Sequence, residues 1–252
     1  MQNTWRRLGT SVGTIIVLLM LMLLVSGCTS ESILPKDESY MTQTEEKKVK
    51  EAAIQYIKNR YNKGFEVKQV SKDHVFGGYY IIEGYMEDGK NTQVYITGNP
   101  PNDFDDTYVA RLWENELEPR IKGIAEQSFD LRLMKPVGYS SGKKRAKYTG
   151  EVPSVYEVLK NGGDQDFELN LDLEVYPHNG KFEEDISKFL NELRKMNFNN
   201  VIITIYVYKD ELKTAPKNIR TGKYLLYRYN IFGDIQKIDI NNLDQYKTVI
   251  KH

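Results

Sequence analysis

The segment Phe167-Glu168-Leu169-Asn170-Leu171-Asp172-Leu173-Glu174-Val175 alternates apolar and polar residues without a break. A period of two is typical of a β-strand with one face on the core, and the other face of this strand is acidic. A second alternating stretch covers residues 200–209, and its apolar positions are Val201, Ile203, Ile205 and Val207. We therefore predict that these two strands are neighbours in one sheet.

The residues between the two strands predict an amphipathic helix over 181–196. Its apolar stripe recurs at three- and four-residue spacing and consists of Phe182, Ile186, Phe189, Leu190 and Leu193. Acidic residues fill the first turn and basic residues the last turn, which complements the helix dipole. A strand–helix–strand unit usually crosses over right-handed, so the two strands are predicted to be parallel.

Shorter patterns flank this unit. Residues 154–160 predict a short helix that ends at Gly162-Gly163. Residues 224–229 and 235–240 predict a terminal hairpin with its turn at Phe232-Gly233-Asp234. Residues 151–252 are therefore expected to form a mixed α/β unit.

The preceding part of the chain predicts an antiparallel unit. A helical stripe begins near Thr44 and ends near Gly64, with Val49, Ala53, Tyr56, Ile57 and Tyr61 as its apolar positions. Three extended segments follow, at residues 65–70, 79–85 and 92–97, and a loop is expected over 98–103. A second helix is predicted over about 106–129, with a kink or break at Pro119.

These patterns predict an α+β fold made of two small units. The first is an α-β-β-β-α antiparallel unit over residues 44–133, and the second is the mixed α/β unit over residues 151–252. The segment 134–150 between them is rich in Gly, Ser and Lys and is expected to be a linker.

Residues 1–27 have the three parts of a secretory signal peptide. Arg6 and Arg7 precede an unbroken apolar run from Ile15 to Val25, and small residues follow it. A membrane-spanning helix needs about 20 apolar residues, so this run is short for one. An uncleaved membrane anchor and a twin-arginine export signal are the alternatives for this segment.

Val25-Ser26-Gly27-Cys28 resembles the lipobox of bacterial prolipoproteins. In that family a diacylglycerol is attached to the cysteine, and cleavage before it makes the cysteine the new N-terminus. Cys28 is the only cysteine of the chain, so it has no partner for an internal disulfide. The resemblance implies Cys28 as the lipid attachment site, carrying palmitate-type fatty acids, and Val25, Ser26 and Gly27 as the cleavage site.

The same resemblance extends to the small lipoproteins of unknown function of Bacillus-type Gram-positive bacteria. It implies a chain anchored by lipid to the cell membrane on its extracytoplasmic face, with a membrane or envelope protein as a possible partner. Residues 28–43 are polar and aperiodic, and they are expected to form a flexible tether behind the acylated cysteine. No catalytic or ligand-binding residue beyond Cys28 is carried over from these lipoproteins.

The charge balance argues against a nucleic-acid partner. The chain has 35 basic and 35 acidic residues, and removal of residues 1–27 takes away only Arg6 and Arg7. The mature chain would then have a net charge of about −2, whereas nucleic-acid binding usually needs a strongly basic face.

The sequence predicts no metal site and no cofactor. His74, His178 and His252 lie far apart, and none has a second histidine within four residues. The cluster from Asn102 to Asp106 lacks the glycine that a calcium loop needs at its sixth position. We therefore expect Asp105 or Asp106 to cap the following helix rather than to bind calcium.

No catalytic residue is assigned, because no nucleophile motif is present. The chain has no Gly-x-Ser-x-Gly turn, and the serines near Lys143 lack the Ser-x-x-Lys spacing. Acidic residues are abundant, however, so hydrolysis through paired carboxylates is kept as the alternative.

Two features suggest a binding surface. Lys143, Lys144, Arg145 and Lys147 form the one concentrated basic run, which could contact anionic headgroups or simply be a solvated loop. Tyr79, Tyr80, Tyr85, Tyr95 and Trp113 form the densest aromatic group, for which burial in the core is preferred over an exposed recognition surface.

The leading functional hypothesis is a non-catalytic, lipid-anchored extracytoplasmic binding or interaction module at the cell membrane. A cell-envelope hydrolase that uses paired carboxylates is the alternative. A solute-binding lipoprotein for transport is disfavoured, because such proteins are usually longer and have repeated βα units in both lobes.

Overall fold

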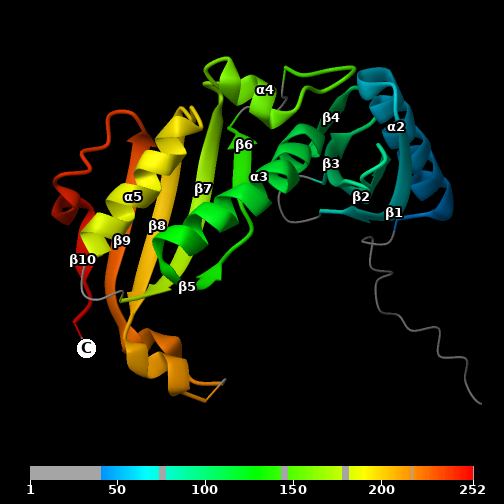
Figure 1. The fold of residues 1–252 in the computed structure, drawn as a ribbon. Helices are drawn as coiled ribbons and strands as arrows, with labels where there is room; N and C mark the ends of the chain where they lie inside the picture. The colour runs from blue at the N-terminus through cyan, green and yellow to red at the C-terminus, as the bar shows by residue number, and fades with distance from the viewer. Residues whose placement is uncertain (1–40, 74–77, 143–146, 178–181, 217, 252) are drawn as a thin grey trace, which may run out of the picture. The chain divides into compact units, whose positions relative to one another are not determined.

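The computed structural model describes residues 41–73, 78–142, 147–177, 182–216 and 218–251. Residues 41–252 form one compact unit. It contains a four-stranded antiparallel sheet and a six-stranded mixed sheet, together with helices (Figure 1). The predicted α+β class is therefore confirmed.

Helix α2 (Gln43–Tyr61) precedes the strands of the four-stranded sheet. The Thr42 hydroxyl accepts a hydrogen bond from the backbone N–H of Glu45 (3.1 Å), and Asn62 ends the helix in the left-handed conformation. The helix therefore starts just before the predicted Thr44 and stops before Gly64. Val49, Ala53, Ile57 and Tyr61 of its predicted stripe are buried.

The four-stranded sheet has the order β1-β2-β3-β4, and neighbouring strands are antiparallel. Its strands are β1 (Gly64–Lys72), β2 (Tyr80–Glu87), β3 (Gln93–Asn99) and β4 (Asp103–Asp106). The predicted meander is confirmed for β1 to β3. The predicted loop over 98–103 was too long, because Asp103 and the following residues pair with β3 to form β4.

Helix α3 (Tyr108–Ser128) follows β4 directly and is not broken at Pro119, contrary to one form of the prediction. Proline removes one hydrogen bond from the helix. The fully buried side chains of Leu117 and Ile121, on either side of Pro119, keep the helix on the core. Packing of the apolar stripe therefore overrides the local preference of proline.

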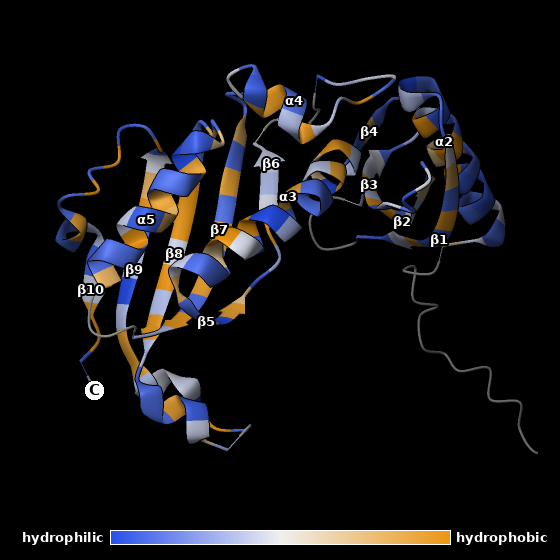
Figure 2. Ribbon diagram, in the orientation of Figure 1, coloured by the Kyte–Doolittle hydropathy of each residue, from blue (hydrophilic) through white to orange (hydrophobic). Residues whose placement is uncertain are grey.

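The six-stranded sheet has the order β10-β9-β8-β7-β5, and β6 also pairs with β7. Its strands are β5 (Asp130–Met134), β6 (Gly138–Ser141), β7 (Phe167–Tyr176), β8 (Asn200–Tyr208), β9 (Leu225–Asp234) and β10 (Lys247–Val249). Strands β7 and β8 are parallel, with Leu171 opposite Ile203, which confirms the central prediction. The alternation is visible as bands along β7 (Figure 2).

Helix α5 (Phe182–Lys195) connects β7 to β8 and, like α3, covers one face of this sheet (Figure 1). The predicted stripe residues Ile186, Phe189, Leu190 and Leu193 are buried, whereas Phe182 is half-buried. The short helix α4 (Val155–Lys160) lies where it was predicted. Three short 3-10 helices complete the described elements, at Asp210–Thr214, Thr221–Tyr224 and Leu243–Tyr246.

The predicted terminal hairpin is wrong. Strand β9 continues to Asp234 because it pairs with β8 along its length, and its other neighbour is β10 rather than residues 235–240. Ile235 and Ile238 are buried although they lie outside any strand. Their backbone carbonyls accept hydrogen bonds from Arg194 of α5, so a loop packed on the core had produced the apolar pattern.

Trp113 of α3 lies at the centre of the aromatic packing. Its indole N–H donates to the carbonyl oxygen of Pro153 (2.9 Å), and its ring centroid lies 4.7 Å from those of Tyr148 and Phe167. Helix α3 contacts β3 as well as β6, so its buried residues belong to the same hydrophobic cluster as both sheets. Residues 138–141 of the predicted linker form β6, whereas the division into units over 44–133 and 151–252 stays a prediction.

Candidate functional site

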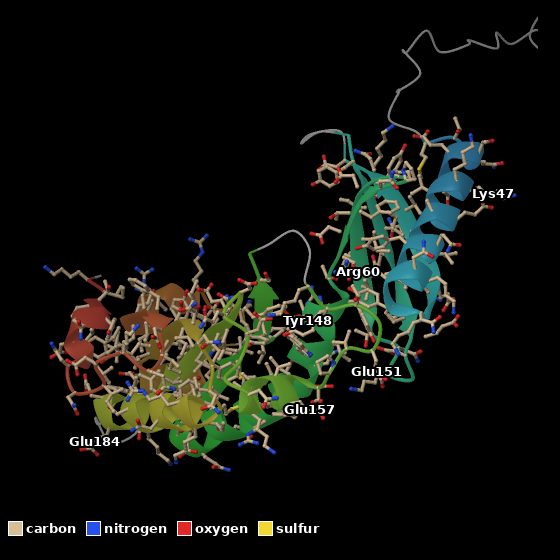
Figure 3. All side chains as sticks on the ribbon, turned by 90° about the horizontal axis from the view of Figure 1, so that it is seen from above. Lys47, Arg60, Tyr148, Glu151, Glu157 and Glu184 are labelled. Atoms are coloured by element: carbon tan, nitrogen blue, oxygen red, sulfur yellow. The ribbon has the colours of Figure 1, made fainter. Side chains whose placement is uncertain are left out.

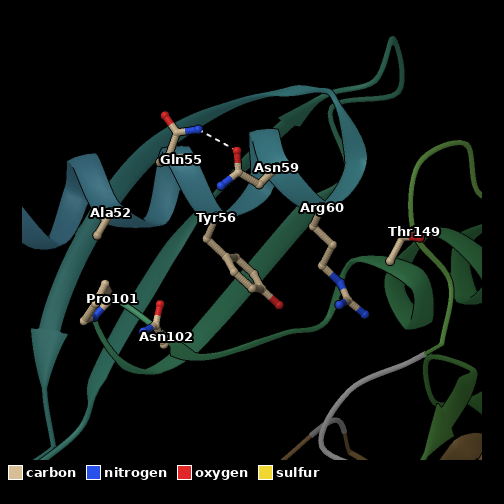
Figure 4. A pocket seen from close by; sticks show the side chains of 8 residues that line it. All are labelled: Ala52, Gln55, Tyr56, Asn59, Arg60, Pro101, Asn102 and Thr149. Atoms are coloured by element: carbon tan, nitrogen blue, oxygen red, sulfur yellow. Dashed lines mark hydrogen bonds between the residues drawn. The ribbon is translucent and has the colours of Figure 1, made fainter.

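A pocket of about 470 Å³ opens between α2 and the β3–β4 turn (Figure 4). Helix α2 lines it with residues at three- and four-residue spacing, which places them on one face of the helix. These residues are Ala52, Gln55, Tyr56, Asn59 and Arg60. The turn contributes Pro101 and Asn102, and Thr149 completes the wall.

Arg60 of the pocket wall forms an ion pair with a buried carboxylate. The Nε atom of Arg60 is 3.2 Å from Oδ2 of Asp106, the last residue of β4. The side chain of Asp106 is only 2% exposed and that of Arg60 is 14% exposed. In the view of Figure 3, Arg60 lies on the side of α2 nearer Tyr148, whereas Lys47 lies on the outer side.

The Asp106 carboxylate is saturated with hydrogen bonds. The hydroxyls of Tyr56 and Tyr61 donate to it at 2.7 and 2.9 Å, and the backbone N–H of Tyr108 donates at 2.9 Å. Arg60 Nε also donates to the Tyr61 hydroxyl at 2.9 Å. A buried carboxylate with this many donors is held in one position.

Burial controls the protonation of this network. Burial and then the charge of Asp106 raise the pKa of Tyr61 far above its ordinary value, so its hydroxyl remains a donor. Burial alone would lower the pKa of Arg60, but the hydrogen bond to Tyr61 and electrostatic interactions with Tyr61, Tyr56 and Asp106 outweigh it and raise that pKa. Arg60 is therefore a permanent cation at the pocket wall.

The predicted N-cap at Asp105 or Asp106 was close to the observed one. The N-cap residue of α3 is Thr107, whose hydroxyl accepts from the N–H of Tyr95 (3.0 Å) and does not cap the helix. Asp106 instead supplies the hydrogen bond to the first helical N–H, that of Tyr108. Sequence reasoning thus found Asp106 but assigned it only the local part of its role.

The pocket wall suits hydrogen bonding rather than acid–base chemistry. Gln55 donates from Nε2 to Oδ1 of Asn59 (2.6 Å), so two amides are already fixed relative to one another (Figure 4). Asn102, Thr149 and Arg60 add further polar groups. In the part of the chain that the structure describes, no carboxylate, imidazole or thiol lines this pocket.

Gly98 precedes the turn that carries Pro101 and Asn102. Replacing it in Gly98→Ala is expected to lower the free energy of unfolding by about 2–3 kcal/mol. Gly98 has φ of 131°, and an added Cβ would lie 1.7 Å from the carbonyl oxygen of Asp103. The matched control is Gly123→Ala in α3, where nothing lies within 4 Å of the added methyl. This control should raise the free energy of unfolding by about 0.5–1 kcal/mol, because alanine is more favourable than glycine inside a helix. Urea unfolding of both variants checks the prediction, and equal effects would contradict it.

Most predicted site residues lie outside the described part of the chain. These are Val25, Ser26, Gly27 and Cys28 of the lipobox, Lys143, Lys144 and Arg145 of the basic run, and His74, His178 and His252. Lys147 is described, and its ammonium pairs with the buried Asp164 carboxylate (Nζ–Oδ2 3.1 Å). One charge of the basic run is therefore already compensated by the protein itself.

The predicted aromatic group is divided by the structure. Trp113 is fully buried, as expected, whereas Tyr79, Tyr80, Tyr85 and Tyr95 are half-buried. Burial alternates along β2 and β3, so Tyr85 and Tyr95 lie on the face opposite to the buried Ile82 and Val94. The preferred burial in the core is therefore confirmed for Trp113 but not for the four tyrosines, which are half-buried.

Among the described residues, no group of three His, Cys, Asp or Glu side chains is arranged to hold a metal ion. Within the same ranges, no helix combines the length and the apolar character needed to span a bilayer.

Comparison with known proteins gives little further information. No protein-family model matches the chain, and no curated protein matches it. Among solved structures, the chain is similar to a DUF5037 family protein from Ruminococcus gnavus, with 10% sequence identity and a TM-score of 0.42. The similarity covers 79% of this chain and 98% of that chain. At this level it supports no argument about function.

Proposed function

We propose that this chain is a lipid-anchored binding module on the extracytoplasmic face of the cell membrane, with its ligand in the α2 pocket. In this proposal residues 1–27 are a signal peptide, Cys28 carries the lipid, and residues 28–43 are a tether. A unit over 44–133, which contains the four-stranded antiparallel sheet, and a mixed α/β unit over 151–252 follow the tether.

The observation that supports a binding role is the α2 pocket, whose wall includes Arg60 of the Arg60–Asp106 ion pair. The hydrogen-bond network of Asp106 fixes Tyr56 and Arg60 before any ligand arrives. A wall fixed in advance loses little conformational entropy on binding, which favours affinity. The amides and the guanidinium suit a polar partner rich in hydrogen-bonding groups, such as a segment of a membrane or envelope protein.

Hydrolysis through paired carboxylates finds no support at this site. Such chemistry needs two carboxyl groups that face the substrate about 5–10 Å apart. The described residues that line the α2 pocket include no carboxylate, and the Asp106 carboxylate is committed to three hydrogen-bond donors and to the ion pair with Arg60. The binding role is therefore preferred.

Photo-cross-linking on intact cells tests the proposed site. A photo-reactive phenylalanine analogue at Gln55 is expected to capture one membrane or envelope partner, identified by mass spectrometry. The matched control places the same analogue at Lys50, which lies on the same helix about 140° around its axis and outside the pocket. Capture of the same partner with equal yield from both positions, or none from Gln55, would contradict the proposal.

A further inference from the structure

A second pocket, of about 250 Å³, is lined by residues of α3, of α4 and of the end of α5. Three of its lining side chains are cations that come from three different helices. Arg120 belongs to α3, Lys160 is the last residue of α4, and Lys195 is the last residue of α5. The chain as a whole has equal numbers of basic and acidic residues, so this is a local excess of positive charge.

Carboxylate side chains supply little negative charge to this pocket, although the C-terminal ends of α4 and α5 bring the negative ends of their helix dipoles to Lys160 and Lys195. Among the described residues of the chain, no carboxylate lines this pocket. Within the described ranges, neither Arg120 nor Lys160 belongs to an ion pair. Lys195 pairs with Glu192 (Nζ–Oε1 2.6 Å), but both side chains are exposed, and exposed pairs contribute little.

The two lysines are not needed to satisfy the ends of their helices. The carbonyl oxygens of Val158 and Leu159 accept from the backbone N–H groups of Gly163 (2.9 Å) and Gly162 (3.1 Å). At the end of α5, the Leu193 carbonyl accepts from the N–H of Met196 (3.0 Å). Backbone groups therefore close both helices, and these carbonyl oxygens do not depend on the two ammonium groups.

Aromatic packing holds the third cation in place. The guanidinium carbon of Arg120 lies 5.8 Å from the ring centroid of Tyr156, which is within the range of a cation–π contact. The Tyr156 hydroxyl donates to the backbone carbonyl of Glu116 in α3 (2.8 Å), so the ring itself is fixed. Arg120 is therefore oriented before any ligand binds.

We propose that this pocket binds a phosphoryl group. Three cations from three helices suit an anion with several oxygens and more than one negative charge better than a carboxylate with one. Arg120 can donate two parallel hydrogen bonds to such an anion, and the amide of Asn197 offers a further donor. Leu159 and Met196 are buried and form the apolar part of the lining.

Titration calorimetry of the full chain in a nonionic detergent tests this proposal with two soluble probes. Inorganic phosphate represents a free phosphate or phosphomonoester. Glycerophosphoglycerol, the deacylated headgroup of phosphatidylglycerol, represents a lipid source. We expect saturable binding of at least one probe, and the probe that binds more tightly identifies the source.

The test variant is Arg120→Gln/Lys160→Gln/Lys195→Gln, which should weaken binding at least tenfold. The matched control is Arg228→Gln/Lys47→Gln/Lys122→Gln. It also removes one arginine and two lysines, but from exposed positions outside the pocket, and it should weaken binding less than twofold. Circular dichroism establishes that both variants fold, and Lys160→Gln alone, at an exposed position, should still weaken binding about threefold. Failure of both probes to saturate, or an equal loss in the control, overturns the proposal.

Discussion

Asp106→Ala is expected to lower the free energy of unfolding by about 3–5 kcal/mol, because it leaves the largely buried guanidinium of Arg60 without its carboxylate. The same change removes the acceptor for the hydroxyls of Tyr56 and Tyr61. Domains of this kind usually have only about 5–15 kcal/mol of total stability. The variant should therefore lose a large part of its stability, as measured by urea unfolding.

Asp103→Ala is the matched control for this prediction. Asp103 begins the same strand, but it is exposed, so its replacement should change the free energy of unfolding by less than about 0.5 kcal/mol. A loss below about 1 kcal/mol for Asp106→Ala would contradict the role assigned to the buried pair.

The double variant Arg60→Met/Asp106→Leu separates the ion pair from simple packing. Removing both charges leaves no unpaired charge in the interior, and such replacements are often neutral or stabilising. The double variant should therefore be more stable, by about 2 kcal/mol, than the sum of its single variants predicts. If the effects of Arg60→Met and Asp106→Leu on the free energy of unfolding are additive, the loss of stability comes from packing alone.

Cys28→Ala is expected to abolish lipid attachment completely. Under the proposed function, the thiol of Cys28 is the one acceptor for the lipid, since the chain has no other cysteine. Each buried methylene of an acyl chain contributes about 0.8 kcal/mol to membrane binding, so the loss of two chains removes the anchor. Cells grown with radiolabelled palmitate should show the label on the wild-type chain and none on the variant.

The variant should also retain residues 1–27, because cleavage before Cys28 depends on that cysteine in the lipoproteins this segment resembles. Thr29→Ala, one residue beyond the cleavage site, is the matched control and should keep both the label and the shorter mass. If the wild-type chain carries no label, the apolar run from Ile15 to Val25 would itself be the membrane anchor. The lipoprotein proposal would then be wrong.

The success of the fold prediction follows from local periodicity. Alternation along β7 and β8, and the apolar stripe of α5 between them, are properties of neighbouring residues, and the structure confirms the parallel pair. The same reasoning failed at residues 235–240, where apolar residues pack on the core from a loop. Burial of a loop therefore produced an apolar pattern over residues 235–240 that resembled the pattern of a strand.

The candidate sites were harder to predict, because their parts lie far apart along the chain. Tyr56 and Tyr61 were recognised only as members of a helical stripe, and Asp106 only as a cap. Nothing near Arg60 in the sequence indicates that it pairs with a carboxylate 46 positions later. The basic pocket likewise joins Arg120, Lys160 and Lys195 from three helices, and none of them belongs to the basic run that the sequence made conspicuous.

The sequence by itself determined the α+β class, the central strand–helix–strand unit and the resemblance to a lipobox around Cys28. Each of these depends on side chains within a few residues of one another, where spacing and backbone geometry are sufficient. Only the tertiary structure decided that the end of β4 lies under α2, and that the ends of two helices meet α3 at a basic pocket. Packing of distant apolar faces brings these groups together, and no local pattern encodes which polar groups will then be neighbours.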